Sequence, residues 1–136
     1  MNMTQNYNPE SDFSFTCEND NTAVIITDYT GTDKTVNIPF EICGLPVIEI
    51  GDEAFVEKGL TSVSIPNSVT RIGAYAFDQN QLDSFTIPDS VTYIGCWAFA
   101  RNQLTSVTIP DGIAHIGESA FGENRLTSVT IPDSVV

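Results

Sequence analysis

Residues with reactive side chains are sparse in this chain. The single histidine, His115, occupies a position that holds Tyr93 and Arg71 at one and two steps of 22 residues earlier, which is typical of a variable exposed site. The sequence contains no Gly-x-Ser-x-Gly elbow, phosphate-binding loop or paired metal-binding histidines. Because catalysis needs several such groups held together, the sequence predicts a protein that is not an enzyme and holds no cofactor.

The three cysteines, Cys17, Cys43 and Cys96, show neither C-x-x-C spacing nor a neighbouring histidine. We therefore expect no zinc site. An odd number leaves at least one thiol free. Cys17 and Cys43 both lie in the amino-terminal portion and are able to pair, and the sequence leaves that question open.

One column of oxygen-bearing side chains recurs every 22 residues and consists of Asn67, Asp89, Asp111 and Asp133. Stacked carboxylates at this spacing are able to hold Ca²⁺ with help from backbone carbonyls. Each of these residues also follows a proline, where an Asp or Asn side chain can bond to a nearby backbone N–H and fix a turn. We favour the turn, and the sequence predicts no metal site.

Composition limits the partners. The 136 residues are 41% hydrophobic and carry a net charge of −13, which fits one folded domain with a real core. Nucleic acid and anionic membrane surfaces are excluded as partners, because both need clustered Lys and Arg. Residues 1–57 hold eleven acids against the single Lys34. This excess attracts a basic partner or a cation, or it keeps the chain soluble, and we favour solubility.

No stretch approaches the ~20 apolar residues of a membrane-spanning helix, so membrane insertion is not expected. The first ten residues, Met1 to Glu10, are polar and contain no secretory signal. The chain is either cytosolic or a mature piece expressed without its leader, and the localisation stays open.

The dominant feature is an internal repeat. A unit of 22 residues can be written L-x-x-V-x-I-P-x-x-V-x-x-I-G-x-x-A-F-x-x-N-x, and its most regular part recurs as IPNSVT at 65–70, IPDSVT at 87–92, IPDGIA at 109–114 and IPDSVV at 131–136. A single unit cannot bury its apolar face alone, so the units must stack into a solenoid with a continuous core.

Each unit reads as two extended segments and a corner. In LTSVTIP, the alternation of Val107 and Ile109 with polar residues predicts a half-buried strand, which Pro110 ends. A second strand such as 91–95 follows, and Gly95 allows a sharp change of direction. The segment 96–102 predicts one turn of helix. The column Asn80, Asn102 and Asn124 is expected to satisfy backbone groups between coils.

The two ends of the chain differ from the repeats. Residues 1–11 are expected to be flexible, 12–46 to form a cap with a β-hairpin over 13–17 and 23–29, and 47–136 to form the repeats. The chain stops at Val136, midway through a coil, which predicts exposed apolar surface and an open strand edge. We favour a fragment of a longer repeat protein. The alternative is a homodimer through the open carboxyl end.

The runs LTSVSIPNSVTRIGAYAF, LDSFTIPDSVTYIGCWAF and LTSVTIPDGIAHIGESAF resemble the BspA-like subclass of bacterial leucine-rich repeats, and the resemblance covers about residues 13–136. The unit is one residue shorter than the commoner one, with Asn where many members have Cys. The resemblance implies a leucine-rich-repeat solenoid of short parallel β-strands with one-turn helical corners and an amino-terminal hairpin cap. It also implies a bacterial surface or secreted protein that serves adhesion or protein recognition.

Two surfaces are candidates for binding. Columns of hydroxyl residues, such as Ser62, Ser84, Ser106 and Ser128, form a flat polar face able to receive a protein or, alternatively, a glycan. The columns that vary most supply Arg71, Tyr75, Tyr93, Trp97 and His115, residue types that are enriched at binding hot spots. The sequence predicts a non-catalytic recognition or adhesion module. The alternative is a structural spacer or self-assembly element.

Overall fold

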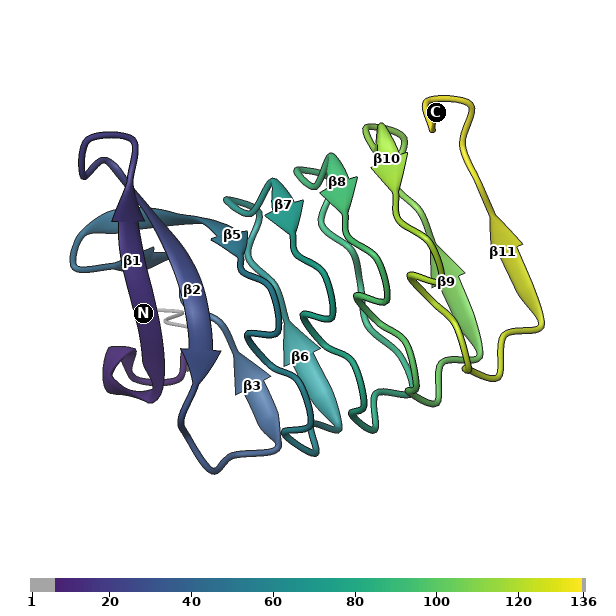
Figure 1. Cartoon of the computed structure of the whole chain (residues 1–136), viewed down its shortest axis with the longest axis horizontal. Helices are drawn as coiled ribbons and strands as arrows, with labels where there is room; N and C mark the ends of the chain where they lie inside the picture. The colour runs from purple at the N-terminus through teal and green to yellow at the C-terminus, as the bar shows by residue number, and fades with distance from the viewer. Residues whose placement is uncertain (1–6, 136) are drawn as a thin grey trace, which may run out of the picture.

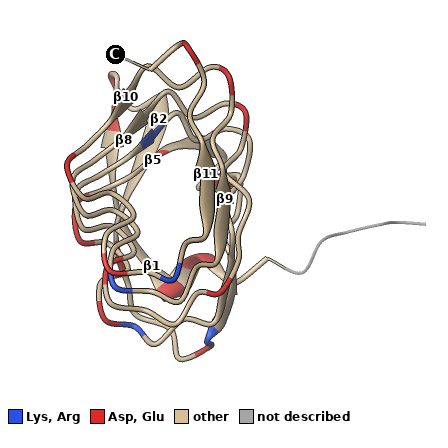
Figure 2. Ribbon diagram, turned by 90° about the vertical axis from the view of Figure 1, so that its right-hand side faces the viewer, with Lys and Arg blue, Asp and Glu red and all other residues tan. Residues whose placement is uncertain are grey.

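Stacked coils form a solenoid in the structure, a computed structural model that describes residues 7–135. Each coil follows one repeat and contributes a segment to each of two walls that face each other across the core (Figure 1, Figure 2). Among the described residues, one short helix, η1 (Glu10–Asp12), precedes the first strand. The predicted solenoid of short parallel strands is confirmed. No helix in this described part has the length and apolar character to cross a membrane.

The first wall consists of three-residue strands: β3 (Thr35–Asn37), β6 (Ser62–Ser64), β9 (Ser106–Thr108) and β11 (Ser128–Thr130). They pair in parallel at equal repeat positions, with Val36 opposite Val63 and Val107 opposite Val129. In β6 and β9, the central valine is buried and the flanking hydroxyl residues are exposed. The alternation of apolar and polar residues in the sequence therefore matches the alternation of buried and exposed side chains in this wall.

The second wall carries the longer sheet. Its parallel strands are β2 (Ala23–Tyr29), β5 (Leu45–Ile50), β7 (Arg71–Ile72), β8 (Tyr93–Ile94) and β10 (His115–Ile116). Two antiparallel strands extend it at the amino-terminal end: β1 (Phe13–Glu18) pairs with β2, and β4 (Glu41–Ile42) pairs with β5. The pair β1 and β2 is the hairpin expected from the sequence.

The segment before the hairpin contacts the lead-in to the repeats. Residues 1–6 lie outside the described part of the chain. The buried Asn8 accepts a hydrogen bond from the backbone N–H of Asn37 (2.7 Å) and donates one to the carboxylate of Asp33 (3.1 Å). Together with the bond from the N–H of Asn8 to the carbonyl of Asn37 (3.0 Å), these contacts join the start of the described chain to the lead-in before the repeats.

The corners between the walls are not helical turns. Trp97 and Arg101 adopt left-handed backbone conformations, with φ of 59° and 53°, which interrupts any helix. The N–H of Trp97 donates to the carbonyl of Glu118 in the next coil, and that of Phe99 donates to Ala120. The predicted helical corner is wrong because every second N–H of the segment bonds to the next coil, whereas a helix bonds all of them within one segment.

The glycine that ends each second-wall strand has a different role from the one predicted. Gly95 does not adopt a positive φ. A Cβ atom built on Gly95 would lie 2.6 Å from the backbone nitrogen of Ala74 in the preceding coil, closer than real Cβ contacts allow. Glycine is needed here because two coils approach backbone to backbone.

The core is a set of identical side chains stacked along the solenoid axis. Phe55, Phe77, Phe99 and Phe121 form a column with ring centroids 4.9–5.7 Å apart and nearly parallel planes. Tyr29 of the cap continues it, with its ring 5.5 Å from that of Phe55. Offset stacking of this kind adds to the free energy of burying the rings, so the cap and the coils share one core.

The asparagine column supplies hydrogen bonds to the backbone groups of each corner. The side-chain amide of buried Asn102 donates to the carbonyls of Phe77, Phe99 and Ala100, and its oxygen accepts from the N–H of Leu82. These distances lie between 3.0 and 3.1 Å. Asn80 and Asn124 repeat the arrangement one coil before and after. The structural role expected for this column is confirmed.

The first wall is interrupted at one coil. The segment 84–86, which occupies the place of a strand between β6 and β9, forms no ladder with either neighbour. Its central residue is Phe85, where the other coils carry Val63, Val107 and Val129. The ring of Phe85 stacks on that of Phe99 at 4.2 Å, and we attribute the interruption to this larger ring, since extra volume in a packed core displaces backbone.

The last described coil exposes apolar side chains. Val129 and Ile131 are 40% and 62% exposed, whereas the equivalent Val107 and Ile109 of the preceding coil are 7% and 5% exposed. The outer edge of β11 has no strand paired to it within the described residues.

Removal of the Asn102 side chain should destabilise the fold strongly. Asn102→Ala leaves the buried N–H of Leu82 without a partner and removes one of two donors from the carbonyls of Phe77, Phe99 and Ala100. We expect a loss of roughly 2–3 kcal/mol in the free energy of unfolding. Urea denaturation followed by circular dichroism measures this. The matched variant Asn124→Ala, in a less buried copy of the same site, should lose less. An unchanged free energy of unfolding in Asn102→Ala would contradict the coil-to-coil role.

Amide exchange should reveal the interruption of the first wall. The N–H of Gly95 donates to Ile72 at 2.8 Å, whereas the N–H groups of residues 84–86 have no hydrogen bond in the structure. We expect protection factors at least about tenfold lower for Phe85 than for Gly95 in hydrogen–deuterium exchange read by NMR. Equal protection would show that segment 84–86 pairs with a neighbouring coil in solution.

Candidate interaction surfaces

Three of the predicted binding residues form one stack on the second wall, which we call the planar stack: Arg71, Tyr93 and His115. The guanidinium carbon of Arg71 lies 3.6 Å from the centroid of the Tyr93 ring. The rings of Tyr93 and His115 are 4.7 Å apart and inclined by 12°. The parallel register places Arg71 opposite Tyr93 and Tyr93 opposite His115, so the strands β7, β8 and β10 position all three.

An acidic residue extends the planar stack toward the cap. Glu49 Oε2 lies 3.8 Å from Nε of Arg71. Burial raises the pKa of the Glu49 carboxyl, and Asp52 and Glu18 raise it further, while Arg71 opposes the shift. Arg71 is therefore held on one side by a carboxylate and on the other by an aromatic face, which fixes its orientation.

The stacking limits what can bind. Both faces of the Tyr93 ring are covered, one by Arg71 and the other by His115, so only the ring edge and the hydroxyl remain for a partner. A sugar that stacks its apolar face on an aromatic ring finds no open face on Tyr93. The side chains of the planar stack are already fixed, so they lose little rotamer freedom on binding. This favours a protein partner that contacts the ring edges, the Tyr93 hydroxyl and the charge of Arg71.

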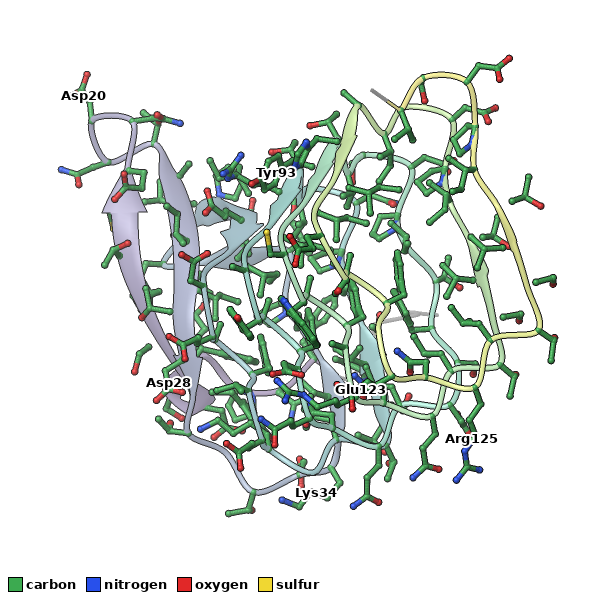
Figure 3. The ribbon with its side chains drawn as sticks, turned by 45° about the vertical axis from the view of Figure 1, so that its right-hand side comes forward. Asp20, Asp28, Lys34, Tyr93, Glu123 and Arg125 are labelled. Carbon is green, nitrogen blue, oxygen red and sulfur yellow. The ribbon has the colours of Figure 1, made fainter. Side chains whose placement is uncertain are left out.

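The other two predicted residues, Tyr75 and Trp97, form a corner pair with parallel planes (2°) and ring centroids 6.4 Å apart. Both adopt a positive φ of 59° at equal positions of adjacent corners. No ring or cation contact joins this pair to the planar stack in the part of the chain that is described. The structure thus divides the five predicted residues into two separate groups. Figure 3 shows Tyr93 near the upper rim, away from Glu123 on the corners.

An ion pair beside the corner pair was not predicted from the sequence. Asp78 is buried, and its carboxylate accepts two hydrogen bonds from Arg101, at 3.0 Å from Nε and 2.7 Å from Nη2. The hydrogen bond to Asp78 raises the pKa of the Arg101 guanidinium. Arg101 also lies over the ring of Trp97, at 5.2 Å. This bidentate contact holds Arg101 over Trp97.

The acidic column behaves differently from the prediction. The side chains of Asp89, Asp111 and Asp133 are exposed and cap no backbone N–H in the described structure. The turns are closed by the backbone itself, since the N–H of Val91 donates to the carbonyl of Pro88 at 3.1 Å. The predicted capping role is therefore wrong, and these carboxylates are free. No cluster of three or more His, Cys, Asp or Glu suited to a metal ion occurs among the described residues.

The hydroxyl face lies on the first wall, where the exposed residues of β6, β9 and β11 bring the serine columns together. Two hollows open on this face, one on each side of segment 84–86. The cysteines are all free and exposed, so Cys17 and Cys43 do not pair in this structure.

Comparison with known proteins agrees with this architecture. The sequence profile of the BspA type leucine rich repeat region matches residues 34–136 with six copies. The crystal structure of a T. pallidum leucine-rich-repeat protein superposes with a TM-score of 0.87 at 33% identity, over 96% of this chain and 63% of the other. The chain thus spans less than two thirds of that protein. No protein with a curated function matches the chain closely.

Two further solved structures share the fold. A leucine-rich-repeat protein from Bacteroides capillosus is 26% identical, with a TM-score of 0.72 over 87% of this chain and 92% of the other. A leucine-rich cell surface protein from Faecalibacterium prausnitzii is 30% identical, with a TM-score of 0.70 over 97% of this chain and 44% of the other. With the profile covering every repeat, the chain belongs to the BspA-type leucine-rich-repeat family.

Proposed function

We propose that this chain is a non-catalytic protein-recognition module and that the planar stack is its main contact surface. The observation that supports this most is the order of Arg71, Tyr93 and His115, which stack at fixed spacing on the outside of the second wall. Arg and Tyr dominate binding hot spots, and here they are already held in place. Repeat solenoids present such extended surfaces to protein partners.

The same geometry argues against catalysis. The ring of His115 stacks on Tyr93, and no group of His, Cys, Asp and Glu gathers around it within the described residues. A general base needs a positioned substrate proton and an orienting partner, and the exposed His115 has no hydrogen-bonded carboxylate in this structure.

Display on a bacterial surface is part of the proposal. The F. prausnitzii relative is described as a cell surface protein, and an adhesive role follows if the chain meets its partner there. A structural spacer or self-assembly element is the second candidate, favoured by the exposed Val129 and Ile131 beside the open edge of β11. Sedimentation velocity separates the two, because self-assembly predicts a concentration-dependent dimer.

The planar stack can be tested with binders selected from a random protein library displayed on phage. Tyr93→Ala should weaken most selected binders by about 2 kcal/mol, roughly 30-fold, because it removes the centre of the stack. Ser106→Ala, an exposed change on the first wall, serves as the matched control and should alter affinity less than about twofold. Binders distributed evenly over the surface would count against the proposal.

The corner pair gives a second test of binding against stability. Tyr75→Ala combined with Trp97→Ala should weaken binders that contact the corner while the melting temperature falls by only a few degrees, because Tyr75 is 38% exposed. A large fall in melting temperature with unchanged affinity would assign the pair to packing between coils. Differential scanning calorimetry and biolayer interferometry measure the two quantities on the same samples.

A further inference from the structure

The interruption of the first wall leaves a strip of backbone without partners. No hydrogen bond involves the backbone of residues 83–87 in the structure. The coils remain joined on either side of the strip: the N–H of Gln81 donates to Leu60 at 2.8 Å, and the hydroxyl of Ser90 donates to Val69 at 2.6 Å. The gap is therefore a short opening, closed at both ends, with free N–H and C=O groups along its length.

The two hollows beside this strip have room for a ligand. Each has a volume of about 310 Å³, several times the space that one water molecule occupies. The first is lined by hydroxyl and amide side chains that include Ser62, Ser64 and Asn67. The second lies between segment 84–86 and the following coil, and its lining includes Asp89, Thr108 and Pro110. Phe85 and Thr86 line both.

Charge selects the kind of ligand. Asp89 lines the second hollow, and Asp111 follows Pro110 at its edge. Neither carboxylate has an ion pair in the structure. The five basic residues, Lys34, Lys58, Arg71, Arg101 and Arg125, all lie outside β6, segment 84–89, β9 and the turn after it. A cationic ligand is therefore attracted to these carboxylates.

We propose that the two hollows form a docking site for an extended basic segment of a partner polypeptide. Side chains of the segment enter the two hollows from the outside and bond to the hydroxyls and to the free backbone groups of residues 84–86 that line them. A Lys or Arg side chain of the segment reaches Asp89. A neutral sugar is less suited, because it gains nothing from the carboxylate of Asp89 and one face of the Phe85 ring is covered by Phe99. The site is on the wall opposite the planar stack, so either proposal can fail without the other.

The decisive variant is Phe85→Val, which restores the residue found at this position in the other coils. We expect the smaller side chain to let segment 84–86 pair with β6 and β9, which closes both hollows without changing any charge. A fluorescent heptapeptide of alternating Lys and Thr should bind the original chain and bind Phe85→Val at least about tenfold more weakly in anisotropy titrations at low salt. Amide protection of residues 84–86 should rise in the same variant.

Two charge variants separate a specific site from general attraction to an acidic protein. Asp89→Asn, which removes the carboxylate in the second hollow, should weaken the peptide at least about threefold. Asp133→Asn removes the same charge from the same column two coils later, outside both hollows, and should leave the affinity unchanged within about twofold. Both residues are exposed, so these variants keep the fold if Phe85→Val does not.

Several outcomes would overturn the proposal. Equal affinity of the basic peptide for the original chain and a folded Phe85→Val shows that the hollows are not used. Equal losses for Asp89→Asn and Asp133→Asn show general charge attraction only. Binding of a Glu–Thr peptide of the same length, or of cellohexaose with the same dependence on Phe85, assigns the hollows to another class of ligand.

Discussion

Hydrogen bonds that run from each coil to the next are the constraint on which the whole structure depends. Strand N–H groups, every second corner N–H and the asparagine amides donate to an adjacent coil, as the bonds of Gly95, Phe99 and Asn102 show. Little holds a single coil closed on its own. The rings of the phenylalanine column, the close approach at the glycines and the outer side-chain stacks all follow from keeping adjacent coils in register.

The sequence predicts much of this fold because a fixed period places equal residues over one another. The repeat strands and the asparagine column follow from spacing alone, and the hairpin follows from two strand-like runs joined by a polar turn. The corner was predicted wrongly because residues 96–102 read locally as a helical turn, and only the neighbouring coil reveals where their N–H groups donate. The interruption at Phe85 was not predicted, since phenylalanine and valine are both apolar in the pattern and differ in volume, which decides packing.

The candidate surfaces likewise contain some contacts that the repeat predicts and others that it does not. Arg71, Tyr93 and His115 share a repeat position, so the register that pairs β7, β8 and β10 also stacks their side chains. The pair of Asp78 and Arg101 joins different positions of adjacent repeats, and a column-by-column reading of the sequence does not connect them. Whether Tyr75 and Trp97 meet the planar stack depends on the path of the corner, which the period leaves undetermined.

The interrupted wall also has a mechanical consequence. On the first wall, β3 with β6 and β9 with β11 form two hydrogen-bonded blocks, and only the second wall and the corners join them. Bending the solenoid so that the first wall opens at Phe85 breaks no ladder bond, whereas bending it anywhere else along that wall does. The coil of Phe85 is therefore the most compliant point of the rod, where its curvature adjusts at the lowest cost to the shape of a surface that it contacts.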